Sequence, residues 1–177
     1  KPTEKSRLKK LAYQAEKTAN EFLQRYDFEK AISFFKEALN NYILCDNEEG
    51  MIQANHNIGR VFLLKDEPAQ AMSYYQKAYA LAKNSPAFKA EQAVILNSVG
   101  EVYFCENNLD KASEYFNQSL SLEKSLNNLE NLAIIKKNLA RISLKKQNYE
   151  QALKDFLEAA ALFEKLFRKN ALENENN

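Results

Sequence analysis

The sequence contains little glycine and little proline, with three residues of each among 177. Both residues are concentrated in tight turns, so their scarcity leaves little material for strands and hairpins. Hydrophobic residues make up 45% of the chain, which is enough for a continuous core and argues against disorder. Together these features favour a helical fold.

Residues that carry catalytic or metal chemistry are also few. His56 is the only histidine, which excludes a metal site built on a histidine pair and gives no support to a Ser–His–Asp arrangement. Cys45 and Cys105 lie far apart and form no CxxC pair, so neither a zinc site nor a disulfide framework is predicted. No glycine-rich loop precedes a helix, as a phosphate cradle would require. We expect no enzymatic activity, no catalytic residues, no metal ligands and no cofactor.

The charge of the chain is nearly balanced, with a net value of +1. Basic residues are interleaved with acidic ones, so we expect no binding to nucleic acid. No apolar run approaches the roughly 20 residues that span a bilayer, so we expect no membrane segment. Reduced thiols at the two cysteines would suit a cytoplasmic protein. The first residue is Lys1 rather than methionine, and we expect the chain to be part of a longer protein.

The stretch 57–78 contains the pattern that the rest of the chain repeats. Gly59 is followed three positions later by the aromatic Phe62, and after a polar break come Ala71 and Tyr75, four positions apart. The first part is typical of a helix with one bare spot on its surface. The second part is typical of a partner helix whose alanines allow it to approach that spot closely.

Four copies of this pattern follow one another at a period of about 40 residues, which is the signature of a repeat architecture. Aligned on the alanine of the second helix, the copies contain Ala19, Phe22, Ala31, Phe35 and Ala38; Gly59, Phe62, Ala71, Tyr75 and Ala78; Gly100, Tyr103, Ala112, Phe116 and Ser119; and Ala140, Ser143, Ala152, Phe156 and Ala159. Ser143 is the one departure from the aromatic position.

These residues resemble the tetratricopeptide repeat (TPR) family, whose motif combines a small residue, an aromatic three positions later and an Ala-x-x-x-aromatic second helix. The two central copies match it best, with Gly59 and Gly100 at the small position. The period is longer than the usual 34 or so residues and the closing proline is absent, and such a period also falls in the HEAT/armadillo range of about 40–47. The residue pattern favours TPR, in the longer-period variety found in some scaffold, motor-cargo and bacterial regulatory proteins.

The resemblance implies an all-α fold, a right-handed α-solenoid of four antiparallel helix pairs forming a TPR-like superhelix. We expect residues 1–177 to form a single repeat domain, with repeats at about 7–45, 51–84, 87–126 and 129–169 and a polar tail at 170–177. Asp27 can cap the second helix and Pro68 suits the first turn of the fourth. The segment 47–50 is predicted to be a loop between the first two repeats.

The resemblance also implies a concave groove, lined by the first helix of each pair, that holds an extended or helical peptide. Asparagine and glutamine there can bond a peptide backbone. Leu63, Phe104 and Leu144 can either hold apolar side chains of a partner or pack between neighbouring helices, and both interpretations stay open. The predicted groove residues are Tyr13, Asn20, Gln53, His56, Arg60, Leu63, Asn97, Glu101, Phe104, Lys137, Arg141, Leu144 and Lys145.

Charged residues recur at one groove position. Arg60, Glu101 and Arg141 occupy it in successive repeats, so we expect Glu101 to pair with at least one of the arginines. Lys137 and Lys145 stand four residues on either side of Arg141, which makes the fourth-repeat end positive. An acidic stretch of a partner could dock there, or the charges could belong to a solvated helix face.

Two functions from different classes follow. In the first, the chain is a non-catalytic scaffold or adaptor that binds a segment of a partner protein in its groove. In the second, it is a regulatory or self-association module of a longer multidomain protein and contacts its own flanking domains or a second copy. The sequence does not identify the partner.

Overall fold

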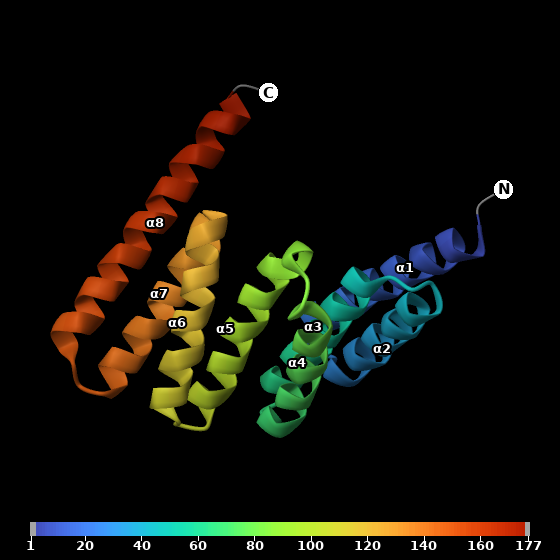
Figure 1. Cartoon of the computed structure of the whole chain (residues 1–177), viewed down its shortest axis with the longest axis horizontal. Coiled ribbons are helices and arrows are strands. Elements are labelled where there is room, and N and C mark those ends of the chain that lie inside the picture. The colour runs from blue at the N-terminus through green and yellow to red at the C-terminus, as the bar shows by residue number, and fades with distance from the viewer. Residues whose placement is uncertain (1–2, 176–177) are drawn as a thin grey trace. The chain divides into compact units, whose positions relative to one another are not determined.

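The computed structural model describes residues 3–175, and within that range the chain is helical, with no strand (Figure 1). This confirms the prediction of an all-α fold made of helix pairs. The helices are α1 (Glu4–Gln24), α2 (Phe28–Leu44), α3 (Glu48–Leu64), α4 (Pro68–Ala82), a short 3-10 helix (Pro86–Phe88), α5 (Lys89–Cys105), α6 (Leu109–Leu126), α7 (Leu129–Lys145) and α8 (Tyr149–Glu175).

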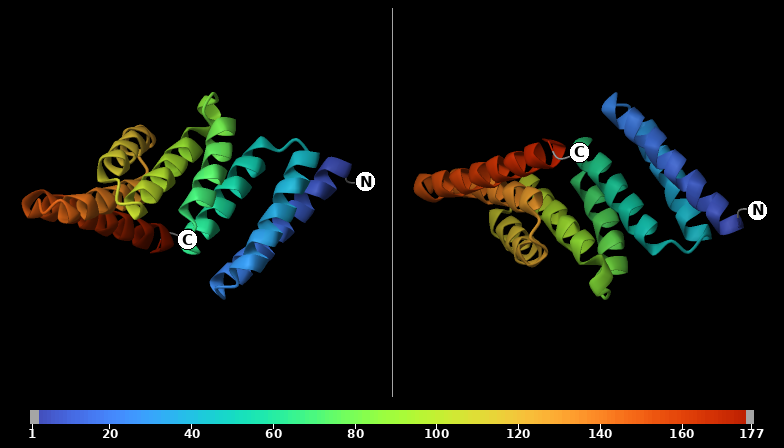
Figure 2. Two further views of the ribbon diagram at one scale, coloured as in Figure 1. Left: turned by 90° about the horizontal axis from the view of Figure 1, so that it is seen from below. Right: turned by 90° about the horizontal axis from the view of Figure 1, so that it is seen from above.

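The chain divides into two compact units, Lys1–Ile95 and Leu96–Asn177, with the boundary inside α5. In the first unit α1 pairs with α2, α3 pairs with α4, and α2 packs on α3 (Figures 1 and 2). In the second unit α6 packs on α7 and α7 pairs with α8. Each unit has its own core: one forms around Tyr42, and the other around Phe116.

In the two central repeats, the glycine at the small position allows the two helices to approach as closely as the sequence indicates. A Cβ atom on Gly59 would lie 2.7 Å from Tyr75 Cε1, and one on Gly100 would lie 2.6 Å from Phe116 Cδ1. Such separations are shorter than carbon atoms tolerate, so only glycine fits without displacing the ring. Both rings are almost fully buried. The aromatic side chain of the second helix therefore packs directly on the backbone of the first.

Several helix starts follow capping signals in the sequence. The Asp27 carboxylate accepts a hydrogen bond from the Lys30 amide at 3.3 Å, and Pro68 stands in the first turn of α4, both as predicted. Thr3 caps α1 by accepting a hydrogen bond from the Ser6 amide at 3.2 Å. The side chains of Asp27 and Thr3 thus satisfy backbone amides that have no partner within the helix.

The segment predicted as a loop at 47–50 is instead the start of a helix, so that prediction is wrong. Asn47 caps α3 and accepts a hydrogen bond from the Gly50 amide at 3.0 Å. Gly50 lies inside the helix and is buried, and a Cβ there would lie 2.3 Å from Tyr42 Cδ1. Gly50 thus makes room for an aromatic ring of α2 and does not break the chain.

Turns between helices repeat one geometry that uses no glycine. Apart from the connection between α4 and α5, each contains a residue with left-handed backbone, and the next residue donates its amide back to a carbonyl five positions earlier, as Asn148 N does to Ser143 O at 2.9 Å. This is the Schellman arrangement, which usually places glycine at the left-handed position. The left-handed residues here are Tyr26, Asp46, Asp66, Asn107, Asn127 and Gln147.

Replacing Gln147 by glycine is expected to stabilise the protein. Gln147 has a φ of 61° and an exposed side chain. Glycine adopts the left-handed conformation without the steric strain that glutamine has there. This gain is larger than the cost of the extra entropy of glycine in the unfolded chain, so the free energy of unfolding should rise by about 0.5 kcal/mol. Urea denaturation would measure the difference. Lys154→Gly, in the exposed interior of α8, is the matched control and should instead destabilise by about 1 kcal/mol.

The last helix is longer than predicted. The sequence suggested an end near Lys169 before a polar tail, but α8 continues to Glu175 and is 27 residues long. Ala171 and Leu172 favour helix and no glycine or proline interrupts them. Of the tail predicted at 170–177, residues 176–177 lie outside the described range. Since α7 has only 17 residues, α8 extends well past it (Figure 1).

The structure also places the cysteines and the apolar helices. Cys45 is buried and Cys105 is exposed, and within residues 3–175 neither forms a disulfide. Residues 3–175 contain no group of three or more histidine, cysteine or acidic side chains arranged to hold a metal ion. None of the helices described is long and apolar enough to cross a bilayer.

Candidate functional site

The predicted groove residues belong to both compact units, and each set is described by itself. On α1 and α3 of the first unit, most of them are exposed, while His56 and Leu63 are half-buried. The members of this set are Tyr13, Asn20, Gln53, His56, Arg60 and Leu63.

On α1, polar side chains form hydrogen bonds within the first unit. Asn20 Nδ2 donates to the Glu16 carbonyl oxygen at 2.9 Å. The Glu16 carboxylate accepts a hydrogen bond from the Tyr42 hydroxyl on α2 at 2.8 Å. Burial raises the pKa of the Glu16 carboxyl, and the bond from Tyr42 offsets part of that rise. Internal hydrogen bonds therefore hold this face, and Tyr13 is 66% exposed.

His56 on α3 is built into the packing of the first unit. Its ring lies 5.4 Å from the ring of Tyr75. Burial, together with the nearby charge of Arg60, lowers the pKa of His56 to about 4. The imidazole is therefore neutral near pH 7, and charge on this part of α3 comes from Arg60. Gln53 is exposed and donates to Glu49 Oε1 at 3.4 Å.

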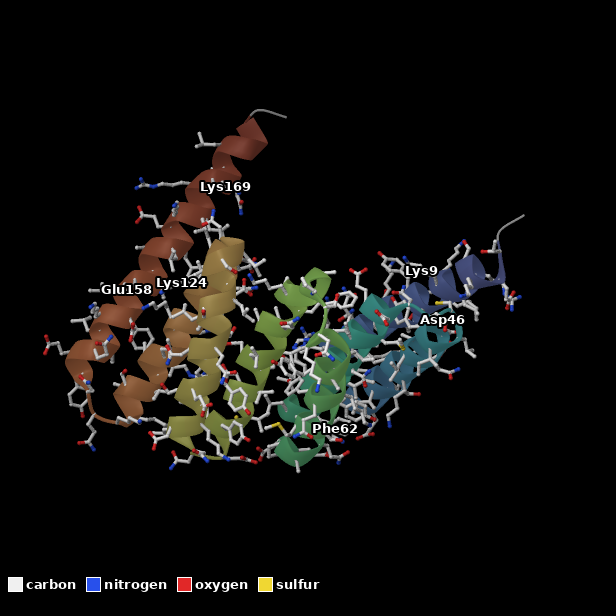
Figure 3. All side chains as sticks on the ribbon, viewed as in Figure 1. Lys9, Asp46, Phe62, Lys124, Glu158 and Lys169 are labelled. Atoms are coloured by element: carbon white, nitrogen blue, oxygen red, sulfur yellow. The ribbon has the colours of Figure 1, made fainter. Side chains whose placement is uncertain are left out.

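The first unit also has an open pocket of about 740 Å³ between the start of α1 and the turn from α2 to α3. Lys9 and Phe88 line it, and Lys5 Nζ binds Asp46 Oδ2 at 2.6 Å. Figure 3 labels Lys9 and Asp46. That ion pair raises the pKa of Lys5 and lowers the pKa of Asp46. Because basic and acidic side chains face one another in this pocket, it favours neither an anionic nor a cationic ligand.

In the second unit the predicted residues meet one another between α5 and α7. We call this group the α5–α7 cluster. It contains the predicted Asn97, Glu101, Phe104, Lys137, Arg141, Leu144 and Lys145, and in addition Asn138.

Arg141 lies at the centre of the α5–α7 cluster. Its Nη1 donates to Glu101 Oε1 and Oε2 at 2.9 and 3.2 Å. The same nitrogen donates to Asn138 Oδ1 at 3.1 Å. The expectation that Glu101 pairs with at least one arginine is confirmed. These bonds fix the orientation of the guanidinium group, whose Nη2 and Nε make no bond to the described residues and remain able to donate.

Asn138 supports this centre and was missed by the sequence prediction. It is 1% exposed, and its Nδ2 donates to Asn97 Oδ1 at 3.1 Å. The prediction used groove positions implied by the resemblance, and Asn138 stands two residues before the small residue, outside them. The sequence did contain a signal for Asn138, because its helical spacing places it on the buried face of α7 between Ile135 and Ile142. A polar side chain on a core stripe requires a partner.

An aromatic ring lies beneath the cations of the α5–α7 cluster. Phe104 is 9% exposed and belongs to the core of the second unit, so it packs between helices. The Arg141 guanidinium lies 4.2 Å from its ring centroid and Lys145 Nζ lies 4.5 Å away. Cation–π attraction of this kind contributes about 0.5–2 kcal/mol, depending on solvent exposure. Leu144 is half exposed beside them.

The balance of charge in the α5–α7 cluster is positive. Lys137, Arg141 and Lys145 are opposed by one carboxylate, that of Glu101. Lys136 is not available to the cluster, because its Nζ binds Asp155 and Glu158 of α8 at 3.2 and 2.7 Å (Figure 3 labels Glu158). The cluster can therefore hold carboxylates by charge-assisted hydrogen bonds.

Comparison with known proteins identifies the repeat. The sequence pattern of the tetratricopeptide repeat matches residues 22–84 and 50–125. No curated protein sequence matches the chain.

Solved structures show the same fold at low sequence identity. The Rap conjugation gene regulator of plasmid pLS20, in complex with the Phr* peptide, is 23% identical with a TM-score of 0.76, over 85% of this chain and 42% of that one. Aspartyl phosphate phosphatase F from Bacillus subtilis is 17% identical with a TM-score of 0.79, over 91% and 42%. MamA is 20% identical with a TM-score of 0.62, over 89% and 81%. The chain thus spans less than half the length of the first two, and the predicted TPR-like α-solenoid class is confirmed.

Proposed function

Because the chain belongs to the tetratricopeptide repeat family, we propose that it is a non-catalytic protein-interaction module, and that its α5–α7 cluster binds an acidic, extended segment of a partner protein. Three cations around one carboxylate carry this proposal. The Rap regulator of pLS20, which has a similar fold, binds a peptide. That likeness supports a peptide as the class of ligand.

The bonds within the cluster explain how a peptide would be held. Glu101 and Asn138 orient the Arg141 guanidinium before any ligand arrives, which reduces the entropy lost on binding. The free Nη2 and Nε of Arg141 can donate to a carboxylate as a fork. Lys137 and Lys145 lie about one helical turn away on either side and add attraction. Leu144 offers an apolar contact beside these charges.

Charge reversal at the edges of the cluster is expected to weaken this binding. The probe is a fluorescent synthetic peptide with alternating Glu and Ala, compared with the same peptide carrying Gln in place of Glu. Lys137→Glu with Lys145→Glu leaves the Arg141–Glu101 pair intact, and we expect the affinity for the acidic peptide to fall at least about tenfold at low salt. Fluorescence anisotropy would measure it.

The matched control reverses two exposed lysines of α1, Lys10→Glu with Lys17→Glu, which changes the net charge equally. The control should bind as the unmodified protein does. If the control weakens binding as much as the cluster variant, only overall charge matters and the proposed site is wrong. Equal binding of the acidic and neutral peptides would also contradict the proposal.

A further inference from the structure

The last helix presents an apolar surface on the side away from α7. We call it the α8 stripe. Its large members recur at helical intervals of three and four, with Ala160 between them, which is the spacing of a coiled-coil seam. They are Tyr149, Leu153, Phe156, Leu157, Phe163 and Phe167, and they are 65%, 61%, 36%, 60%, 40% and 76% exposed.

Equivalent positions of an earlier second helix are covered. Leu153, Phe156 and Phe163 correspond, through the repeat alignment, to Ile32, Phe35 and Tyr42 of α2. Those three residues are 5%, 0% and 5% exposed, since α2 lies between α1 and α3. The α8 stripe therefore has the residues of a helix that is packed on both sides, but among the described residues its large side chains remain 36–76% exposed.

A further repeat of the usual kind does not fit the stripe. The left-handed turn residues Asn107, Asn127 and Gln147 follow one another at intervals of about one helix and its turn, and the next would fall at Phe167. There the chain remains helical and continues to Glu175. Lys169 lies on this extension (Figure 3). A second α8, which has the same length, can cover the stripe from Tyr149 to Phe167.

The first helix of a second copy does not fit either. In the repeat alignment, Gly50 and Ala54 of α3, which face α2, correspond to Lys10 and Gln14 of α1. Long polar side chains at those places suit a helix that ends an array facing water. Stacking α1 on the α8 stripe would bury them without partners, which disfavours head-to-tail association.

We propose that two copies of the chain associate through their α8 stripes, with the two α8 helices antiparallel about a twofold axis. A second α8 has the required length and the same apolar seam. Residues 149–158 contain three carboxylates and one lysine, whereas residues 159–170 contain three basic residues and one carboxylate. Antiparallel packing places these halves opposite each other. The match is partial, because Asp155 and Glu158 also bind Lys136.

The size of the stripe suits a moderate dimer. With total areas of about 200 Å² per large apolar side chain, the exposed fractions give roughly 700 Å² on one copy. That is above the few hundred Å² that monomers usually expose, and close to the ~800 Å² per partner of a standard interface. We therefore expect a dimer at micromolar concentrations.

Sedimentation velocity of the unmodified chain between about 1 and 200 μM tests the proposal. We expect a concentration-dependent dimer that becomes a monomer in Phe163→Asp with Phe167→Asp. Leu44→Asp with Leu64→Asp changes two apolar residues of similar exposure outside the stripe and should leave the dimer intact. Circular dichroism confirms that each variant is folded. A monomer throughout the range, or a dimer that survives the stripe variant, overturns the proposal.

Disulfide trapping tests the orientation in a Cys105→Ser background. Ala160→Cys lies at the centre of the antiparallel pair and is expected to form a covalent dimer on oxidation, because its Cβ atoms approach closely. Lys169→Cys lies far from its counterpart and is expected not to. A covalent dimer through Lys169→Cys and none through Ala160→Cys would overturn the antiparallel arrangement.

Discussion

Replacing Lys136 by methionine is expected to lower the free energy of unfolding by about 2–4 kcal/mol, because it leaves a buried carboxylate without its cation. Asp155 is 5% exposed and accepts a hydrogen bond from Lys136 Nζ at 3.2 Å. Gln151 Nε2, at 2.9 Å from Asp155, would remain, but an amide does not neutralise the charge. Urea denaturation followed by circular dichroism measures the loss.

The neighbouring Lys137 is the matched control. It is exposed and makes no ion pair with the described residues, so Lys137→Met should change the free energy of unfolding by no more than about 0.5 kcal/mol. Equal effects of the two substitutions would show that the Lys136–Asp155 pair does not stabilise the fold.

The pH dependence of this ion pair follows from the pKa of Lys136. Burial alone would lower that pKa, but hydrogen bonds to Glu158 and Asp155 outweigh it and raise the pKa above 10.5. A group whose pKa is raised by folding stabilises the protein fully below its unfolded pKa and loses that contribution as the pH rises through the folded value. The difference between Lys136→Met and the unmodified chain should thus be constant near neutral pH and shrink in alkali.

The ion pair also explains why the fourth repeat has Ser143 at a position where the other repeats have an aromatic residue. In the first three repeats the position of Ser143 holds an aromatic residue that stacks on another from the second helix, as Phe62 stacks on Tyr74 with centroids 5.5 Å apart. In the fourth repeat Ser143 and Asp155 occupy those two positions. Lys136→Leu combined with Ser143→Phe and Asp155→Tyr should restore the stack and recover much of the stability lost in Lys136→Met.

The fold followed from the sequence where one periodic pattern carried the information. Small and aromatic residues at a constant period predicted helix pairs, since each alanine or glycine marks a close approach between two helices. Asp27 and Pro68 marked helix starts by local chemistry. Such features depend on residues near in sequence or on repetition, and a single chain reveals both.

The remaining features depend on partners that the pattern does not name. Gly50 was interpreted as a loop because glycine usually breaks helices, whereas the reason for it is the ring of Tyr42 on another helix. Asn138 was missed because its partner Asn97 stands 41 residues earlier in the chain and becomes a neighbour only after folding. For the groove, the resemblance supplied positions but not contacts, and it could not show that Phe104 faces the core.

Gly50 also gives the second large expected effect. Gly50→Ala should lower the free energy of unfolding by about 2–4 kcal/mol, through overpacking against a ring and the loss of a hydrogen bond. A Cβ 2.3 Å from Tyr42 Cδ1 must move the ring, which is only 5% exposed and packed in the core of the first unit. Moving it also takes the hydroxyl away from Glu16 Oε2, whose partner oxygen Oε1 is already buried without a hydrogen bond.

A double-mutant cycle separates this mechanism from a simple effect of helix propensity. Alanine favours helix over glycine by about 1 kcal/mol, so without the ring Gly50→Ala should be stabilising. In a Tyr42→Ala background, we therefore expect Gly50→Ala to be neutral or stabilising, with a coupling energy of about 2 kcal/mol or more between the two sites. Chemical denaturation of the unmodified chain, the two single variants and the double variant gives the four free energies of unfolding that the cycle requires. If Gly50→Ala costs the same with and without Tyr42, contact with the ring is not the reason for glycine at this position.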